Sequence, residues 1–134
     1  MPLDKLKYEI KLVNNNLLTD IFLSVSKTDN SGERIRVVLD ERIDRRTELN
    51  NGQLIRLYKD IEKLKDEDNL TIINDYLKIE LENFQDKFLG PLYDTFVMFK
   101  NTEMASLVVD EKRKRVERST RQDDLFEKIL YPES

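Results

Sequence analysis

The spacing of apolar residues between positions 53 and 89 constrains the fold of this chain more than any other feature of its sequence. In QLIRLYKDIEKLKDED the apolar side chains recur every three or four positions, at Leu54, Leu57, Tyr58, Ile61 and Leu64. The following segment, LTIINDYLKIELENFQDKFL, repeats the spacing with a wider apolar face at Ile73, Leu77, Leu81, Phe84 and Phe88. This is the repeat of a helix that buries one side. The spacing therefore predicts two consecutive amphipathic helices.

The scarcity of glycine and proline extends the helical prediction to most of the chain. The sequence holds 3 Gly and 3 Pro in 134 residues, whereas sheet-rich folds use many such residues in tight turns. We predict a predominantly helical single domain over 1–134, a bundle of four to six helices with residues 53–100 as its framework. Breaks are expected at Asp29–Gly32 and Asn50–Gly52, and a stop or kink is expected at Gly90–Pro91. A short last helix is expected after Ser119 or Thr120.

The first forty residues allow two structures. A helical stripe is formed by Leu6, Ile10, Val13, Leu17, Ile21 and Val25. The alternation of apolar and charged residues from Lys5 to Leu12 is equally typical of a strand, and Asn14–Asn16 would then form a hairpin loop. The alternative fold is therefore α+β, with a three-stranded meander over about residues 5–40 packed on the C-terminal helices.

Several chemistries lack their usual residues. The chain has no His and no Cys, so imidazole bases, thiolates and the commonest zinc ligands are missing. Its three glycines form no phosphate-binding loop. Asp66–Asn69 is interpreted as a polar capping loop, and Glu80, Glu82 and Asp86 are interpreted as parts of solvated helix faces. We expect no enzyme, no cofactor, no metal site and no small-molecule substrate.

A basic cluster stands out near the C-terminus of this acidic chain. It consists of Lys112, Arg113, Lys114, Arg115, Arg118 and Arg121. A second group is formed by Arg42, Arg45 and Arg46. The clusters could contact phosphates, but acidic residues flank the first cluster and no aromatic residue within it could stack on bases. A solvated helix with internal pairs such as Glu111/Arg115, or a protein-docking face, is the preferred interpretation.

The tail over residues 122–134 has the pattern of a docking helix. Its apolar residues are Leu125, Phe126, Ile129 and Leu130. Such a stripe fits a groove on another protein. The alternative is that the tail folds back onto the core of its own chain.

These features together predict a non-enzymatic protein–protein interaction module. It would be a small assembly subunit, adaptor or inhibitor, of phage, viral or other mobile-element origin, with a protein or a second copy of itself as partner. A nucleic-acid-binding accessory protein is the alternative. No apolar segment approaches the length of about 18 residues typical of a membrane span, so we expect an intracellular, cytoplasmic protein with no membrane contact, or a nuclear one if its host is eukaryotic.

Overall fold

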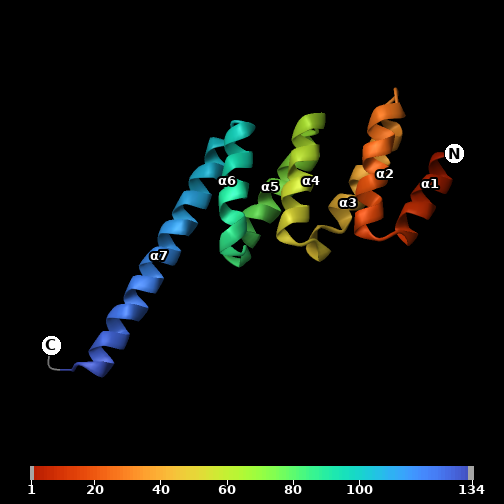
Figure 1. Cartoon of the computed structure of the whole chain (residues 1–134). Coiled ribbons are helices and arrows are strands. Elements are labelled where there is room, and N and C mark those ends of the chain that lie inside the picture. The colour runs from red at the N-terminus through yellow and green to blue at the C-terminus, as the bar shows by residue number, and fades with distance from the viewer. Residues whose placement is uncertain (1, 133–134) are drawn as a thin grey trace. The chain divides into compact units, whose positions relative to one another are not determined.

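The computed structural model describes residues 2–132, and within them the chain is helical with no strand (Figure 1). The α-helices are α1 (Leu3–Glu9), α2 (Asn15–Thr28), α3 (Glu33–Asp44), α4 (Asn51–Leu64), α5 (Glu67–Glu80), α6 (Asp86–Met98) and α7 (Thr102–Leu130). Short 3₁₀ turns are η1 (Ile10–Leu12), η2 (Arg46–Glu48) and η3 (Leu81–Asn83). The predominantly helical class is confirmed. Seven α-helices replace the expected four to six, and the β-meander alternative is not supported.

The contacts of the chain divide it into two compact units, Met1–Ile73 and Asn74–Ser134. In the first unit, α3 lies against α1, α2 and α4. In the second unit, α6 and α7 form a hairpin, and α7 also contacts η3. The single domain over 1–134 stays a prediction.

The N-terminal segment is neither one continuous helix nor a hairpin, because the asparagine run interrupts it. Val13 is extended, and the Asn14 side chain accepts a hydrogen bond of 2.8 Å from the Leu17 N–H at the start of α2. Asparagine is among the best residues for this capping position. The break shifts the buried face by one position, so that Leu18 is buried and Leu17 is exposed.

Asp29 holds the start of α3 through its side chain. The Asp29 carboxylate accepts hydrogen bonds from the N–H groups of Arg34 at 2.8 Å and Ile35 at 3.1 Å. Desolvation acts against ionisation of this carboxyl. The hydrogen bonds from Ile35, Ser31 and Arg34 outweigh it, and they hold the pKa of Asp29 below its ordinary value.

Of the stop or kink expected at Gly90–Pro91, the stop is wrong, because α6 continues through both residues. The chain breaks earlier, at Phe84 and Gln85, which have extended backbone angles. Pro91 cannot donate a hydrogen bond to the carbonyl four residues before it, yet the buried side chains of Leu89, Leu92 and Phe96 keep the helix packed through this point.

The last helix, α7, is continuous over 29 residues, so the break expected at Ser119 or Thr120 is absent. Its N-terminal capping residue is Asn101, whose side chain accepts a hydrogen bond of 3.3 Å from the Met104 N–H. The first half lies beside α6, and the second half extends beyond it (the blue helix in Figure 1). Every described residue from Val116 onward is exposed. None of the described helices combines the length and apolar character needed to cross a bilayer.

Candidate partner-binding site

The N-terminal arginine group serves the core of the first unit. Arg42 is only 4% exposed, and its guanidinium donates a hydrogen bond of 2.7 Å to the Asp60 carboxylate on α4. The guanidinium carbon also lies 4.9 Å from the centre of the Phe22 ring. Burial lowers the pKa of Arg42, and the pairing with Asp60 opposes this shift. A side chain enclosed in this way cannot reach a phosphate backbone.

The other two members of this group hold backbone carbonyls. Arg45 donates hydrogen bonds of 2.7 Å to the Ile10 carbonyl and 2.6 Å to the Val13 carbonyl, and it pairs with Glu41 at 3.2 Å. These hydrogen bonds hold the break that separates η1 from α2 against the end of α3. Arg46 donates to the Ile43 carbonyl at 2.9 Å. The predicted candidates Arg42, Arg45 and Arg46 thus make contacts inside the first unit.

In the C-terminal cluster, Arg115 has a comparable structural role. Its guanidinium donates to the carbonyls of Leu81 at 3.2 Å and Glu82 at 3.3 Å, and it pairs with Asp86 at 2.5 Å. These groups belong to η3 and to the first residue of α6. Arg115 therefore attaches α7 to the N-terminal end of α6. The second half of α7 continues beyond that end.

Most other cations of the cluster also have neighbours within the second unit. The buried Glu111 carboxylate accepts from Arg115 at 3.4 Å, which forms the expected i,i+4 pair, and from Arg118 at 3.2 Å. Arg113 pairs with Asp110 at 3.5 Å, and the Lys112 amine lies 5.8 Å from the centre of the Tyr93 ring. Lys114 and Arg121 are exposed. The cluster is to a large extent a self-paired helix surface.

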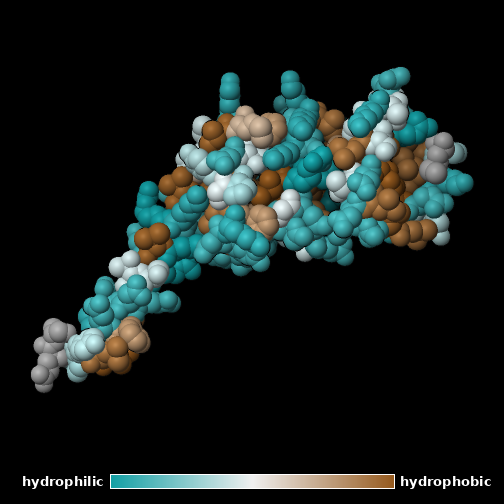
Figure 2. Space-filling view, viewed as in Figure 1, coloured by the Kyte–Doolittle hydropathy of each residue, from teal (hydrophilic) through white to brown (hydrophobic). Residues whose placement is uncertain are grey.

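The predicted apolar docking residues are all exposed on the second half of α7. The exposed fractions are 59% for Leu125, 63% for Phe126, 76% for Ile129 and 52% for Leu130. Figure 2 shows apolar atoms gathered near the C-terminal end of this helix. The tail does not fold back onto a core in this structure, and no polar break separates it from the rest of α7.

These apolar residues continue the face by which α7 packs in its own unit. At about 100° per residue, Leu125, Phe126 and Ile129 project in the same sector of the helix as the buried Met104, Val108 and Glu111. The sector is covered in the first half of α7 and uncovered in the second. We call the uncovered part, formed by Arg118, Gln122, Leu125, Phe126, Ile129 and Leu130, the tail face.

Sequence reasoning found the apolar part of the tail face but missed its extent. The break expected near Ser119 separated Leu125 from Arg118, which belongs to the same face of α7. The helical periodicity from Met104 to Ile129 could have indicated that these residues share one face, because the periodicity continues without a shift through both halves of α7.

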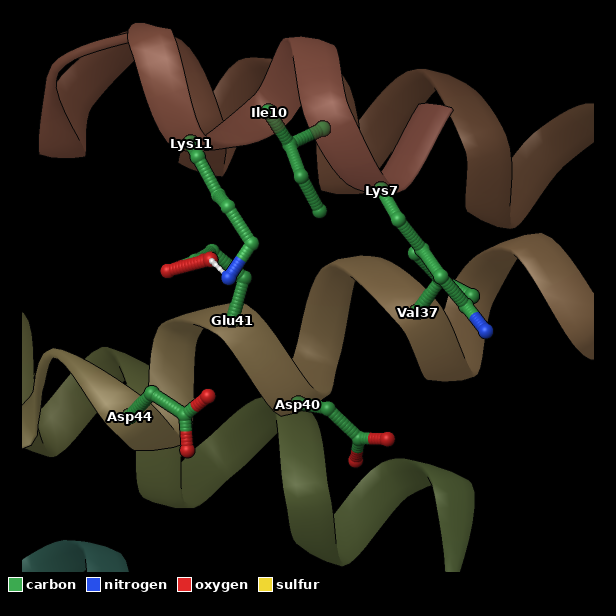
Figure 3. Close-up of a pocket in the computed structure, with 7 residues that line it drawn as sticks. All are labelled: Lys7, Ile10, Lys11, Val37, Asp40, Glu41 and Asp44. Carbon is green, nitrogen blue, oxygen red and sulfur yellow. Dashed lines mark ion pairs between the residues drawn. The ribbon is translucent and has the colours of Figure 1, made fainter. Parts of the chain in front are cut away.

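The first unit contains a groove between α1 with η1 and α3 (Figure 3). Its volume is about 170 Å³, and its walls are Lys7, Ile10, Lys11, Val37, Asp40, Glu41 and Asp44. Lys11 pairs with Glu41 across it at 3.7 Å. The groove brings opposite charges together but holds no Ser, Thr or Tyr that could act as a nucleophile. Within residues 2–132, no group of three or more His, Cys, Asp or Glu is arranged to hold a metal ion.

Comparison of the chain with family models, with curated proteins and with solved structures finds no match.

Proposed function

We propose that this chain is a non-enzymatic protein–protein interaction module whose docking element is the tail face of α7. It would serve inside the cell as an assembly subunit, adaptor or inhibitor. One observation carries the proposal: α7 continues beyond α6 with its packing face apolar and uncovered. Contiguous exposed apolar surface is typical of interaction sites, and apolar residues at helical spacing are the usual anchors of a helix that docks on a partner.

The alternative, nucleic-acid binding, gains less support from the contacts. Arg42 and Arg45 make hydrogen bonds within the first unit, and Arg115 makes hydrogen bonds beside the N-terminal end of α6. Four exposed cations of α7, Lys114, Arg118, Arg121 and Lys128, lie on one side of the helix, but the carboxylates of Glu117 and Asp124 lie next to them. Neighbouring carboxylates repel a phosphate backbone, so this side of α7 is poorly suited to bind one.

Site-specific photocrosslinking tests the proposal. A photoreactive amino acid would replace Phe126 on the tail face, or Thr120, which is exposed on the opposite side of the same helix. We expect a discrete protein adduct from position 126 in cells of the source organism, and none from position 120. The partner would then be purified, and Phe126→Ser should weaken its binding at least tenfold, as loss of a buried aromatic anchor does.

A defined melting temperature equal to that of the unsubstituted chain would show that Phe126→Ser leaves the fold intact. Equal adduct yields at both positions, nucleic-acid adducts in place of protein, or unchanged affinity of the Phe126→Ser variant would each contradict the proposed function.

A further inference from the structure

We propose that the tail face receives an acidic amphipathic helix of a partner protein, which continues the position of α6 along α7. This inference rests on the proposed function and names the chemistry of the partner. It follows from two features of the second unit: the charges that border the tail face, and the interface with α6 that the tail face extends.

One border of the tail face carries four cations, and Glu117 and Asp124 lie beyond them on the side away from the face. Lys114, Arg118, Arg121 and Lys128 follow one another at intervals of four, three and seven residues. Such intervals keep side chains on one side of a helix, here within an arc of about 80°. All four are exposed. Arg118 reaches Glu111, whereas no carboxylate of the described residues pairs with Arg121 or Lys128.

The other border carries both signs of charge. It contains Lys112 and Val116 toward the covered half, and Asp123 and Glu127 toward the end of the helix. A helix lying on the tail face would therefore meet cations first on one side only, because Glu117 and Asp124 lie farther from the face than these cations. Acidic residues along one flank of that helix would match these cations, because opposite charges across an interface favour the correct partner and orientation.

The existing contact of α7 with α6 combines an apolar face with an ion pair at its end. Met104 and Val108 of α7 are buried, as are Leu92 and Phe96 of α6. At the edge of this contact, Asp86 of α6 pairs with Arg115 of α7. The tail face begins one turn after Arg115, so a second helix placed there would lie beyond the N-terminal end of α6.

Charge disfavours two other occupants. If two copies of the tail paired antiparallel about Gln122, the cation border of one copy would lie against the cation border of the other. The two Arg121 side chains would then be close together, and like charges repel. A lipid surface is best matched by a helix with cations along both borders of its apolar face, whereas Asp123 and Glu127 occupy one border here.

The test uses the full chain and three probes. Two are synthetic helical peptides with identical leucine faces, one flanked by Glu and the other by Lys, and the third is a vesicle containing phosphatidylserine. Fluorescence anisotropy should show the Glu-flanked peptide binding at least tenfold more tightly at low salt. The difference should shrink as salt screens the exposed charges. Co-sedimentation with the vesicles should show that the chain binds the phosphatidylserine surface more weakly than it binds the Glu-flanked peptide.

A charge-reversed variant, Arg121→Glu with Lys128→Glu, should reverse the preference between the peptides. Its matched control is Arg113→Glu with Lys87→Glu, which changes the net charge equally at exposed positions away from the tail face. The control should keep the preference for the Glu-flanked peptide. Circular dichroism of both variants would show whether α7 remains helical.

Several results would overturn the inference. Equal affinity for both peptides, or binding of neither, would refute an acidic partner. Tighter binding to vesicles would assign the face to a membrane. Self-association abolished by Phe126→Ser would assign it to a second copy. The photocrosslinking experiment is independent, so a protein adduct at position 126 without selectivity between the peptides would leave the proposed function standing while this inference fails.

Discussion

Removal of either partner of the ion pair between Arg42 and Asp60 should lower the free energy of unfolding, but by different amounts. The two side chains are 5% and 4% exposed, and they lie 2.7 Å apart. Asp60 also accepts from Arg56 at 3.2 Å, but the Arg56 side chain is 43% exposed. Removal of Asp60 therefore leaves Arg42 as a buried cation without its carboxylate. Removal of Arg42 leaves Asp60 with a second, more hydrated partner.

The magnitudes follow from this difference. Asp60→Leu should lower the free energy of unfolding by about 3–5 kcal/mol, the usual cost when one partner of a buried pair is removed. Arg42→Met should cost less, about 1–3 kcal/mol, because Arg56 still satisfies part of the carboxylate. The double variant should lie within about 2 kcal/mol of the unsubstituted chain, since two apolar residues of similar size replace the pair.

Urea unfolding followed by far-UV circular dichroism would measure the three free energies. Hydrogen exchange of the amides in α3 and α4 would locate the loss in the first unit. The reasoning would be refuted if Arg42→Met cost as much as Asp60→Leu, or if the two single costs simply added in the double variant, because the coupling would then be absent.

Three further perturbations have defined outcomes. Asn14→Ala should destabilise α2 by about 1 kcal/mol through loss of its cap, measured by urea unfolding, whereas the exposed Asn16→Ala should change much less. Arg115→Met should speed hydrogen exchange at the start of α6 by removing its contacts to η3 and Asp86; unchanged exchange there would contradict the assigned role. Asp29→Asn should be less stable than the unsubstituted chain at pH 7. Because the folded pKa of Asp29 is lowered, its contribution is full above the unfolded pKa and is lost as pH falls through the folded pKa, so thermal melts of the two proteins should converge below about pH 4.

The helical class could be predicted from the sequence because local apolar periodicity is a property of consecutive residues. The α4 helix shows this best: Leu54, Leu57 and Ile61 are buried as their spacing predicts, and Asn50 forms a capping box with Gln53 at its start.

Breaks between helices were harder to place, because tertiary packing decides them. Gly90 and Pro91 are strong local signals for a helix end, yet the burial of Leu89 and Leu92 keeps α6 intact around them. Conversely, nothing in the local pattern around Phe84 and Gln85 indicates a break.

The roles of the arginines depended on partners far away in the sequence. Arg45 contacts the carbonyl of Ile10, 35 positions earlier, and Arg115 contacts that of Leu81, 34 positions earlier. Composition shows that such cations exist, but not which carbonyls the fold brings to them. The i,i+4 pairs of Glu41 with Arg45 and of Glu111 with Arg115 were accessible to helical spacing.

The continuity of α7 has a consequence for how its second half becomes ordered. An isolated helix of about 12–15 residues is marginal in water, chiefly because the first turn is costly to form. Here the half packed beside α6 already supplies that turn, so the tail only needs to propagate an existing helix. Its helical population should decline gradually toward Leu130, and a partner would select an extension that the hairpin has already nucleated. Affinity could then be tuned at Ser119 or Thr120, by residues that favour or oppose helix propagation without touching the partner.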